Sequence, residues 1–213
     1  MKLDIKIPET LNDLTLLQWQ KYTLIIDKDS EEDFANRKVL QIFYGIKNEH
    51  YDSLKIKDIG LMVDELSAAL TEKPSLVMRF ELDGIEYGFV PYLDDITFGE
   101  FVDLDKYSNV KDYHKLMSIL YRPIKKTSGK TYSIEKYKGS HERLNNMPLG
   151  VALSAAAFFF DIGLQLTIDT LKFSTPPTEE LIKKRDLVLN GLGILLSTRY
   201  PMATYINLNK LKT

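Results

Sequence analysis

The sequence predicts a mostly helical α+β domain in which two β-hairpins pack on a long apolar helix. Apolar residues recur at helical spacing over the first 73 residues, and the period then switches to two on both sides of Asp83-Gly84. A second pair of alternating segments precedes the uncharged stretch at residues 147–160. With 213 residues and 44% hydrophobic content, the chain can bury such a core without covalent or metal cross-links.

The first 73 residues predict a half-buried strand followed by three amphipathic helices. Thr15 and Gln18 form a capping box, in which side chain and backbone satisfy each other's hydrogen-bonding groups. Ser30 is expected to cap the second helix, and Gly45 is its expected C-terminal stop. These signals place the strand at residues 2–7 and the helices at residues 16–26, 31–44 and 56–70.

Two hairpins and two short helices are predicted next. Asp83-Gly84 suits a type I′ turn, which needs positive φ at both central residues. Thr97 and Glu100 form a second capping box, and Asn109 is expected to cap the helix that follows. The signals place strands at residues 76–82, 85–92, 124–125 and 131–137, and helices at residues 98–107 and 110–121.

The C-terminal third predicts the core helix and a separate tail. Pro148 suits the first turn of an apolar helix that is expected to run to about residue 172. Its 14 uncharged residues fall short of the roughly 20 that cross a bilayer, so no membrane span is expected. Ser-Thr-Pro-Pro at residues 174–177 indicates a linker. The expected division is one domain at 1–173, with parts at 1–73 and 74–173, and a C-terminal helix and tail at 178–213.

Charge and cysteine content exclude several classes of partner and chemistry. The 28 basic and 30 acidic residues leave a net charge of −2 with no long run of either sign, so neither nucleic acid nor a membrane surface is an expected partner. The absence of cysteine excludes disulfides and thiolate chemistry, and fits a reducing compartment. The first ten residues are charged and lack an apolar core, so they do not resemble a signal peptide.

The candidate catalytic residues are the carboxylates around the start of the helix at residues 98–107. Glu100, Asp103 and Asp105, with Asp94 and Asp95 nearby, could hold magnesium or calcium, and they define the hypothesis of a metal-dependent enzyme. Their spacing matches no calcium loop, however, and capping and the helix macrodipole already explain acids at a helix start. We therefore expect a non-enzymatic protein with no catalytic residues, cofactor or metal.

The three histidines offer no alternative site. His50, His114 and His141 lack the i, i+3 or i+4 spacing of a helical zinc pair. Each lies in a polar loop or among charged neighbours, so we expect solvated or capping histidines.

Aromatic residues provide the evidence for protein partners. Phe158-Phe159-Phe160 places aromatic rings around three sides of one helix, more than a small domain readily covers. The 12 tyrosines favour an interface as well, although packing within the hairpins explains them equally well. The single Trp19 is expected in the core rather than at an interface. The candidate contact residues are Trp19, Tyr87, Phe89, Tyr92, Phe98, Tyr132, Tyr137 and Phe159.

Four blocks of sequence resemble a family of proteins encoded by tailed bacteriophages of Bacteroidetes, including crAss-like phages. They are FELDGIEYGFVPYLDDITFGEFVDLDKY, YHKLMSILYRPI, YSIEKYKG and MPLGVALSAAAFFFDIG, at residues 80–107, 113–124, 132–139 and 147–163. The blocks cover under half of the chain, and the segments 14–22 and the helix ending at Gly45 are similar too. The chain departs from the family at Gly150, where the family is expected to carry an acid in M-P-L-D-V.

The resemblance implies virion morphogenesis rather than a reaction. It leads us to expect a non-enzymatic virion structural or assembly protein, such as a neck, tail or cargo component, that contacts other phage proteins or further copies of itself. A tail-assembly chaperone that is absent from the mature virion is the alternative. The expected location is the virion, or the host cytoplasm during assembly.

Overall fold

The structure is a computed structural model that describes residues 7–27, 29–71, 74–92, 96–129, 131–139 and 142–159. The predicted α+β, mostly helical fold with one antiparallel sheet is confirmed. The predicted strand at residues 2–7, apart from the exposed Ile7, lies outside the described residues. So do the end of the core helix, the Pro-Pro linker, the C-terminal helix and the tail.

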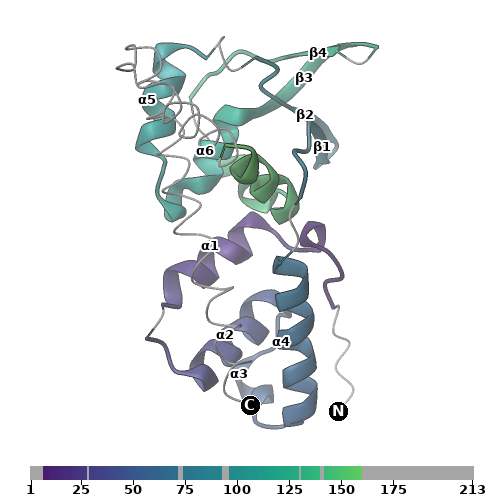
Figure 1. Ribbon diagram of the computed structural model, residues 1–213, viewed down its shortest axis with the longest axis vertical. Coiled ribbons are helices and arrows are strands. Elements are labelled where there is room, and N and C mark those ends of the chain that lie inside the picture. Colours follow the sequence, from purple (N-terminus) through teal and green to yellow (C-terminus); the bar gives the residue numbers. More distant parts are fainter. Residues whose placement is uncertain are drawn as a thin grey trace, which may run out of the picture.

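The N-terminal helices gather at one end of the elongated molecule (Figure 1). The Thr15 box is confirmed, since its hydroxyl accepts from the Gln18 amide and its own amide donates to Gln18 Oε1. The predicted Ser30 cap is wrong: Glu31 is the N-cap, because the Ser30 hydroxyl donates to Asp27 in the preceding turn. The elements are η1 (Leu11–Asp13), α1 (Leu16–Ile25), α2 (Glu32–Phe43), α3 (Asn48–Tyr51) and α4 (Ile56–Leu70).

Both predicted hairpins form, and they join into one four-stranded antiparallel meander in the order β1-β2-β3-β4. Asp83 and Gly84 have φ values of 52° and 74°, as the type I′ turn requires. Pro123 lies in β3 opposite Tyr87 and accepts from the Glu135 amide through its carbonyl. The strands are β1 (Arg79–Leu82), β2 (Ile85–Phe89), β3 (Tyr121–Ser128) and β4 (Thr131–Ile134).

Two short helices connect β2 to β3 at the same end of the molecule as the sheet (Figure 1). Asn109 is an N-cap but makes no side-chain cap bond, and it begins a 3₁₀ turn rather than the predicted α-helix. Tyr121, which we expected in that helix, starts β3 because it pairs with Phe89 and its hydroxyl donates to the Val77 carbonyl. The elements are α5 (Phe98–Lys106), η3 (Val110–Asp112) and α6 (Tyr113–Leu120), with η4 (Glu142–Asn146) after β4.

The sheet packs on the helical segment at residues 149–159, as predicted. The Phe89 ring lies 5.7 Å from Phe158 and 6.3 Å from Phe159, measured between ring centroids. Ser154, completely buried on this helix, accepts a hydrogen bond from the Val77 amide. Buried aromatic rings such as these contribute much of the free energy that stabilises a core. Within the described ranges, every helix is too short or too polar to cross a membrane.

Backbone hydrogen bonds join the two ends of the molecule at the start of this helix. The Leu16 amide donates to the Met147 carbonyl, and the Leu149 amide donates to the Leu14 carbonyl. A Cβ on Gly150 would lie 2.6 Å from Asn12 Oδ1 and 3.1 Å from Leu11 Cβ, so a larger residue requires the Asn12 side chain to move. The acid expected here from the family resemblance would therefore displace the Asn12 side chain from its place beside Gly150.

Candidate functional site

Glu100 forms the buried centre of the acidic cluster singled out in the sequence. It is 2% exposed on the inner face of α5. Oε2 accepts from the Thr97 amide and hydroxyl, both at 2.7 Å, which confirms the second capping box. Oε1 lies 2.7 Å from Arg122 Nη1 in β3. Both carboxylate oxygens are therefore engaged in structural contacts, and α5 is fixed to the sheet through a buried ion pair.

The other candidate carboxylates do not converge on Glu100. Asp103 accepts a hydrogen bond of 2.7 Å from the Tyr137 hydroxyl, and burial and this carboxylate raise the pKa of Tyr137. Asp105 is exposed, and Asp94 and Asp95 lie outside the described residues. Among the described residues, no three His, Asp or Glu side chains are placed to share a metal ion.

A pocket of about 290 Å³ opens beside Arg122. Strand β3 and the segment after β4 supply most of its wall, and α6 and η4 supply the rest. Arg122 Nε is buried against the wall and has no hydrogen-bond partner within the part of the chain that the structure describes. Four cations and one carboxylate belong to the lining, so the pocket is electropositive. Its lining residues are Ser118, Arg122, Pro123, Glu135, Lys136, Tyr137, Lys138, Gly139 and Arg143.

His114 is buried where α1 meets α6, contrary to the expectation of a solvated histidine, because α1 and η4 cover it. Its Nε2 lies 2.7 Å from Glu142 Oε2, and its Nδ1 lies 3.3 Å from Gln20 Nε2. This arrangement fits a neutral ring that carries its proton on Nε2, beside the Glu142 carboxylate, and accepts at Nδ1. Burial lowers the pKa of His114, and the Glu142 carboxylate offsets part of that effect. His50 is partly exposed, and His141 lies outside the described residues.

The predicted partner-contact residues separate into buried and exposed groups. Trp19, Tyr87, Phe89 and Phe159 are 0–7% exposed and pack inside the chain, so they present no surface to a partner. Trp19 lies 5.8 Å from the Tyr113 ring, which confirms its expected place in the core. Tyr132 and Tyr137 are half-buried, and only Tyr92 and Phe98 are largely exposed, at 66% and 81%.

Sequence reasoning missed the basic pocket. The signal was present, since residues 122–143 contain seven basic and two acidic residues in a chain whose net charge is −2. No long run of basic residues forms, because uncharged residues separate them along the chain. Only the packing of Arg122 against Glu100 and the fold of the segment after β4 bring four of these cations around one hollow.

Comparison with known proteins finds no match, whether with protein families, with curated proteins or with solved structures.

Proposed function

We propose that the chain is a non-enzymatic virion structural or assembly protein of a tailed bacteriophage that acts through protein-protein contacts. The resemblance of residues 80–107 to phage proteins supports this function. In the fold, this block comprises β1, β2 and α5, which form a large part of one end of the molecule (Figure 1).

The observation that carries the proposal is the outward face of α5. Phe98 is 81% exposed and Val102 is 45% exposed, and their i, i+4 spacing places them side by side on one helix face. The opposite face of α5 is occupied by Glu100 and Leu104, which are buried. The helix therefore presents apolar side chains to solvent in addition to those it buries, a pattern that favours contact with a partner.

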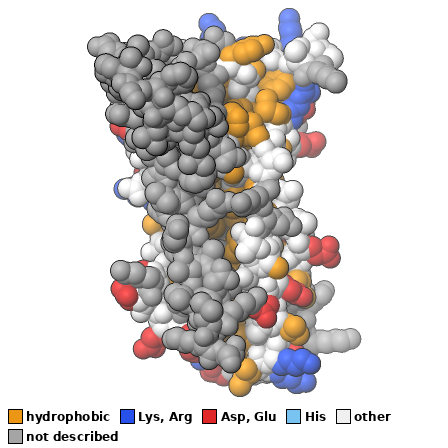
Figure 2. All heavy atoms as spheres, in the orientation of Figure 1, with side chains coloured by type: hydrophobic (Ala, Val, Ile, Leu, Met, Phe, Trp, Pro, Cys, Tyr) orange, Lys and Arg blue, Asp and Glu red, His pale blue; other side chains and the backbone are white. Residues whose placement is uncertain are grey.

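Hydrophobic side chains are also visible on the sheet-bearing half of the face in Figure 2. Met78, which precedes β1, is 42% exposed. Apolar surface next to polar surface is typical of protein interfaces, in which a desolvated centre is surrounded by a wet rim. A neck, tail or cargo position in the particle and a chaperone bound to a tail component both use such a surface.

Mass spectrometry of purified particles from the phage that encodes this chain tests the proposal. Stoichiometric presence supports a structural component, and presence only in complexes isolated from infected cells supports the chaperone. Absence from both particles and complexes overturns the proposal.

A variant pair tests the role of the α5 face. Phe98→Ser with Val102→Ser is expected to abolish incorporation or complex formation, because the apolar contact is lost. The matched control is Ile56→Ser with Leu61→Ser, since these side chains on α4 are 89% and 52% exposed. Equal behaviour of the two pairs would show that the α5 face is not the contact.

A further inference from the structure

We propose that the pocket beside Arg122 binds carboxylate side chains of an acidic segment in a partner protein. The proposal rests on the protein-contact function above and specifies the chemistry of one partner. It concerns a different surface from the outward face of α5, so the two can fail separately.

The geometry of Arg122 supplies the first argument. Its guanidinium has five N–H donors in a rigid plane, and Glu100 occupies Nη1 at 2.7 Å. Nε is buried in the pocket wall with no partner in the described structure, so one donor is left unsatisfied at a cost in free energy. Nε and the remaining Nη form an edge that suits a bidentate oxyanion. A carboxylate that enters the pocket, with a small movement of the side chain, satisfies this edge.

The charge of the pocket supplies the second argument. Lys136, Lys138 and Arg143 accompany Arg122 in the lining, where Glu135 is the acidic residue, and Glu100 pairs with Arg122 from behind the wall. Lys138 lies 3.3 Å from Glu135, so this carboxylate neutralises one cation and the lining keeps a positive excess. The three flanking cations are exposed, and their long side chains can adjust to an incoming anion.

A second hollow, about 570 Å³ in volume and lined by α2, α3 and the start of α4, contains an arginine whose Nε is paired. Arg37 in that hollow donates to Asp33 at 2.8 Å and to Asp52 at 2.9 Å, and its guanidinium lies 4.0 Å from the Tyr51 ring centroid. Its donors serve the chain's own carboxylates. Arg122 differs because its Nε has no such partner among the described residues.

The surroundings favour a protein segment over a nucleic acid. Glu135 in the wall opposes the dense negative charge of a polyphosphate more than the single charge of a carboxylate. The volume of about 290 Å³ lies at the lower end of the range for ligand pockets, which fits a side chain rather than a nucleotide.

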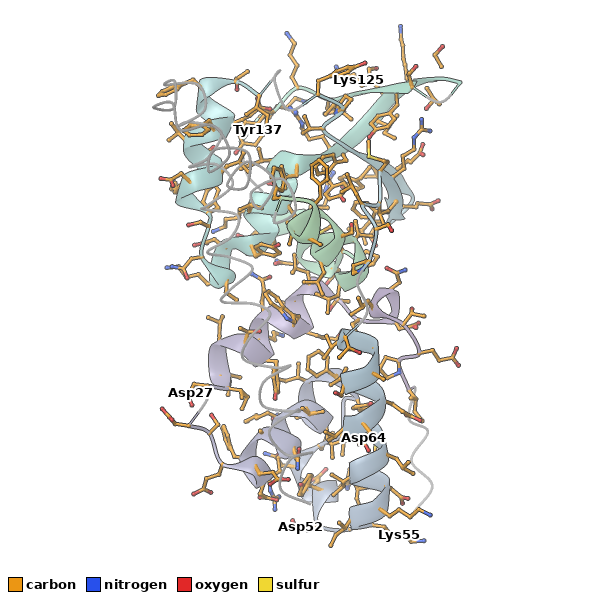
Figure 3. The ribbon with its side chains drawn as sticks, in the orientation of Figure 1. Asp27, Asp52, Lys55, Asp64, Lys125 and Tyr137 are labelled. Carbon is orange, nitrogen blue, oxygen red and sulfur yellow. The ribbon has the colours of Figure 1, made fainter. Side chains whose placement is uncertain are left out.

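Fluorescence anisotropy with a fluorescein-labelled hexaglutamate peptide tests the proposal on the full chain. We expect the peptide to bind, hexaglutamine not to bind, and added salt to weaken binding. Lys136→Gln with Lys138→Gln should lower the affinity by about tenfold, because two charge-assisted contacts are lost. The control, Lys55→Gln with Lys57→Gln, removes equal charge at the opposite end of the molecule from Tyr137 and should change affinity less than about twofold (Figure 3).

Arg122→Lys separates geometry from charge. It keeps one positive charge beside Glu100 but lacks the two-donor edge, so we expect weaker peptide binding by a protein whose unfolding transition shows that it is folded. Three results would each overturn the proposal. They are no peptide binding at millimolar concentration, an equal loss in the Lys55 and Lys57 control, and tighter binding of oligothymidylate than of hexaglutamate.

Discussion

Replacing Arg122 by methionine measures the contribution of the buried ion pair to stability. The variant leaves the Glu100 carboxylate, 2% exposed, without its cation at 2.7 Å. Removing one partner of a buried pair costs about 3–5 kcal/mol, because a charge stays desolvated and uncompensated. The two Thr97 hydrogen bonds to Oε2 persist and stabilise the carboxylate in part. We therefore expect a loss of about 3 kcal/mol in the free energy of unfolding.

Urea unfolding followed by the fluorescence of Trp19 provides the assay. This residue is the only tryptophan and is 2% exposed, so its emission reports loss of the core. Glu100→Gln combined with Arg122→Met keeps an oxygen for the Thr97 cap and removes the buried charge. The double variant should recover at least about 1 kcal/mol of the loss, which the double-mutant cycle records as a coupling energy.

The reasoning is refuted if Arg122→Met costs less than about 1 kcal/mol, the value of an exposed pair. Strict additivity of the two single changes would refute it too, since the pair would then have no coupling. Lys57→Met, at an exposed position on α4, is the control and should change stability by less than about 0.5 kcal/mol.

Two further predictions concern packing and pH. Gly88→Ala should destabilise the protein by about 1–3 kcal/mol, because the new Cβ would lie 2.9 Å from Tyr132 Cδ2 and force the ring away. Unfolding in urea measures the loss, which should shrink in a Tyr132→Ala background. Stability should also fall as the pH drops below about 6.5, the ordinary histidine pKa, because burial lowers the pKa of His114 and the unfolded chain then binds more protons. One histidine gives a slope of at most about 1.4 kcal/mol per pH unit, measured by urea unfolding between pH 7 and 5.5.

Matched variants make both predictions decisive. Tyr132→Phe loses the hydroxyl bonds to the Phe89 and Met78 carbonyls but keeps the ring, so Gly88→Ala should cost as much in that background as in the native chain. His114→Gln should flatten the pH dependence, and His50→Gln, at a partly exposed position, should not. The charged groups that act on His114 are Glu142, Lys115 and Asp112. An unchanged slope in His114→Gln would contradict the assignment of the pH dependence to His114.

Local signals predicted those elements whose cause lies within a few residues. The Thr15 and Thr97 capping boxes depend on groups three residues apart, and both helix starts are confirmed. Asp83-Gly84 determines the first hairpin because the turn is set by the φ preferences of two residues. Ser30 shows the limit, since a neighbouring carboxylate three residues before it competed for the same hydroxyl.

Contacts between distant segments decided the features that local signals did not predict. Tyr121 belongs to β3 rather than to α6 because it pairs with Phe89 in the sheet and its hydroxyl donates to the Val77 carbonyl. Both partners lie more than 30 residues earlier in the chain. The ion pair of Glu100 could not be predicted from the sequence either, because Arg122 lies in β3 and meets α5 only in the folded chain. Four of the eight predicted contact residues proved to be core for the same reason, since burial depends on neighbours rather than on side-chain type.

The sequence by itself therefore determined the fold class, the capping boxes at Thr15 and Thr97 and the turn at Asp83-Gly84, because propensity and capping act over one turn of chain. Tertiary structure decided which charges meet. It placed Arg122 between a buried carboxylate and an open pocket, and it turned an unremarkable distribution of lysines into one electropositive hollow. Coulomb interactions depend on distance in space, and the sequence reports only distance along the chain.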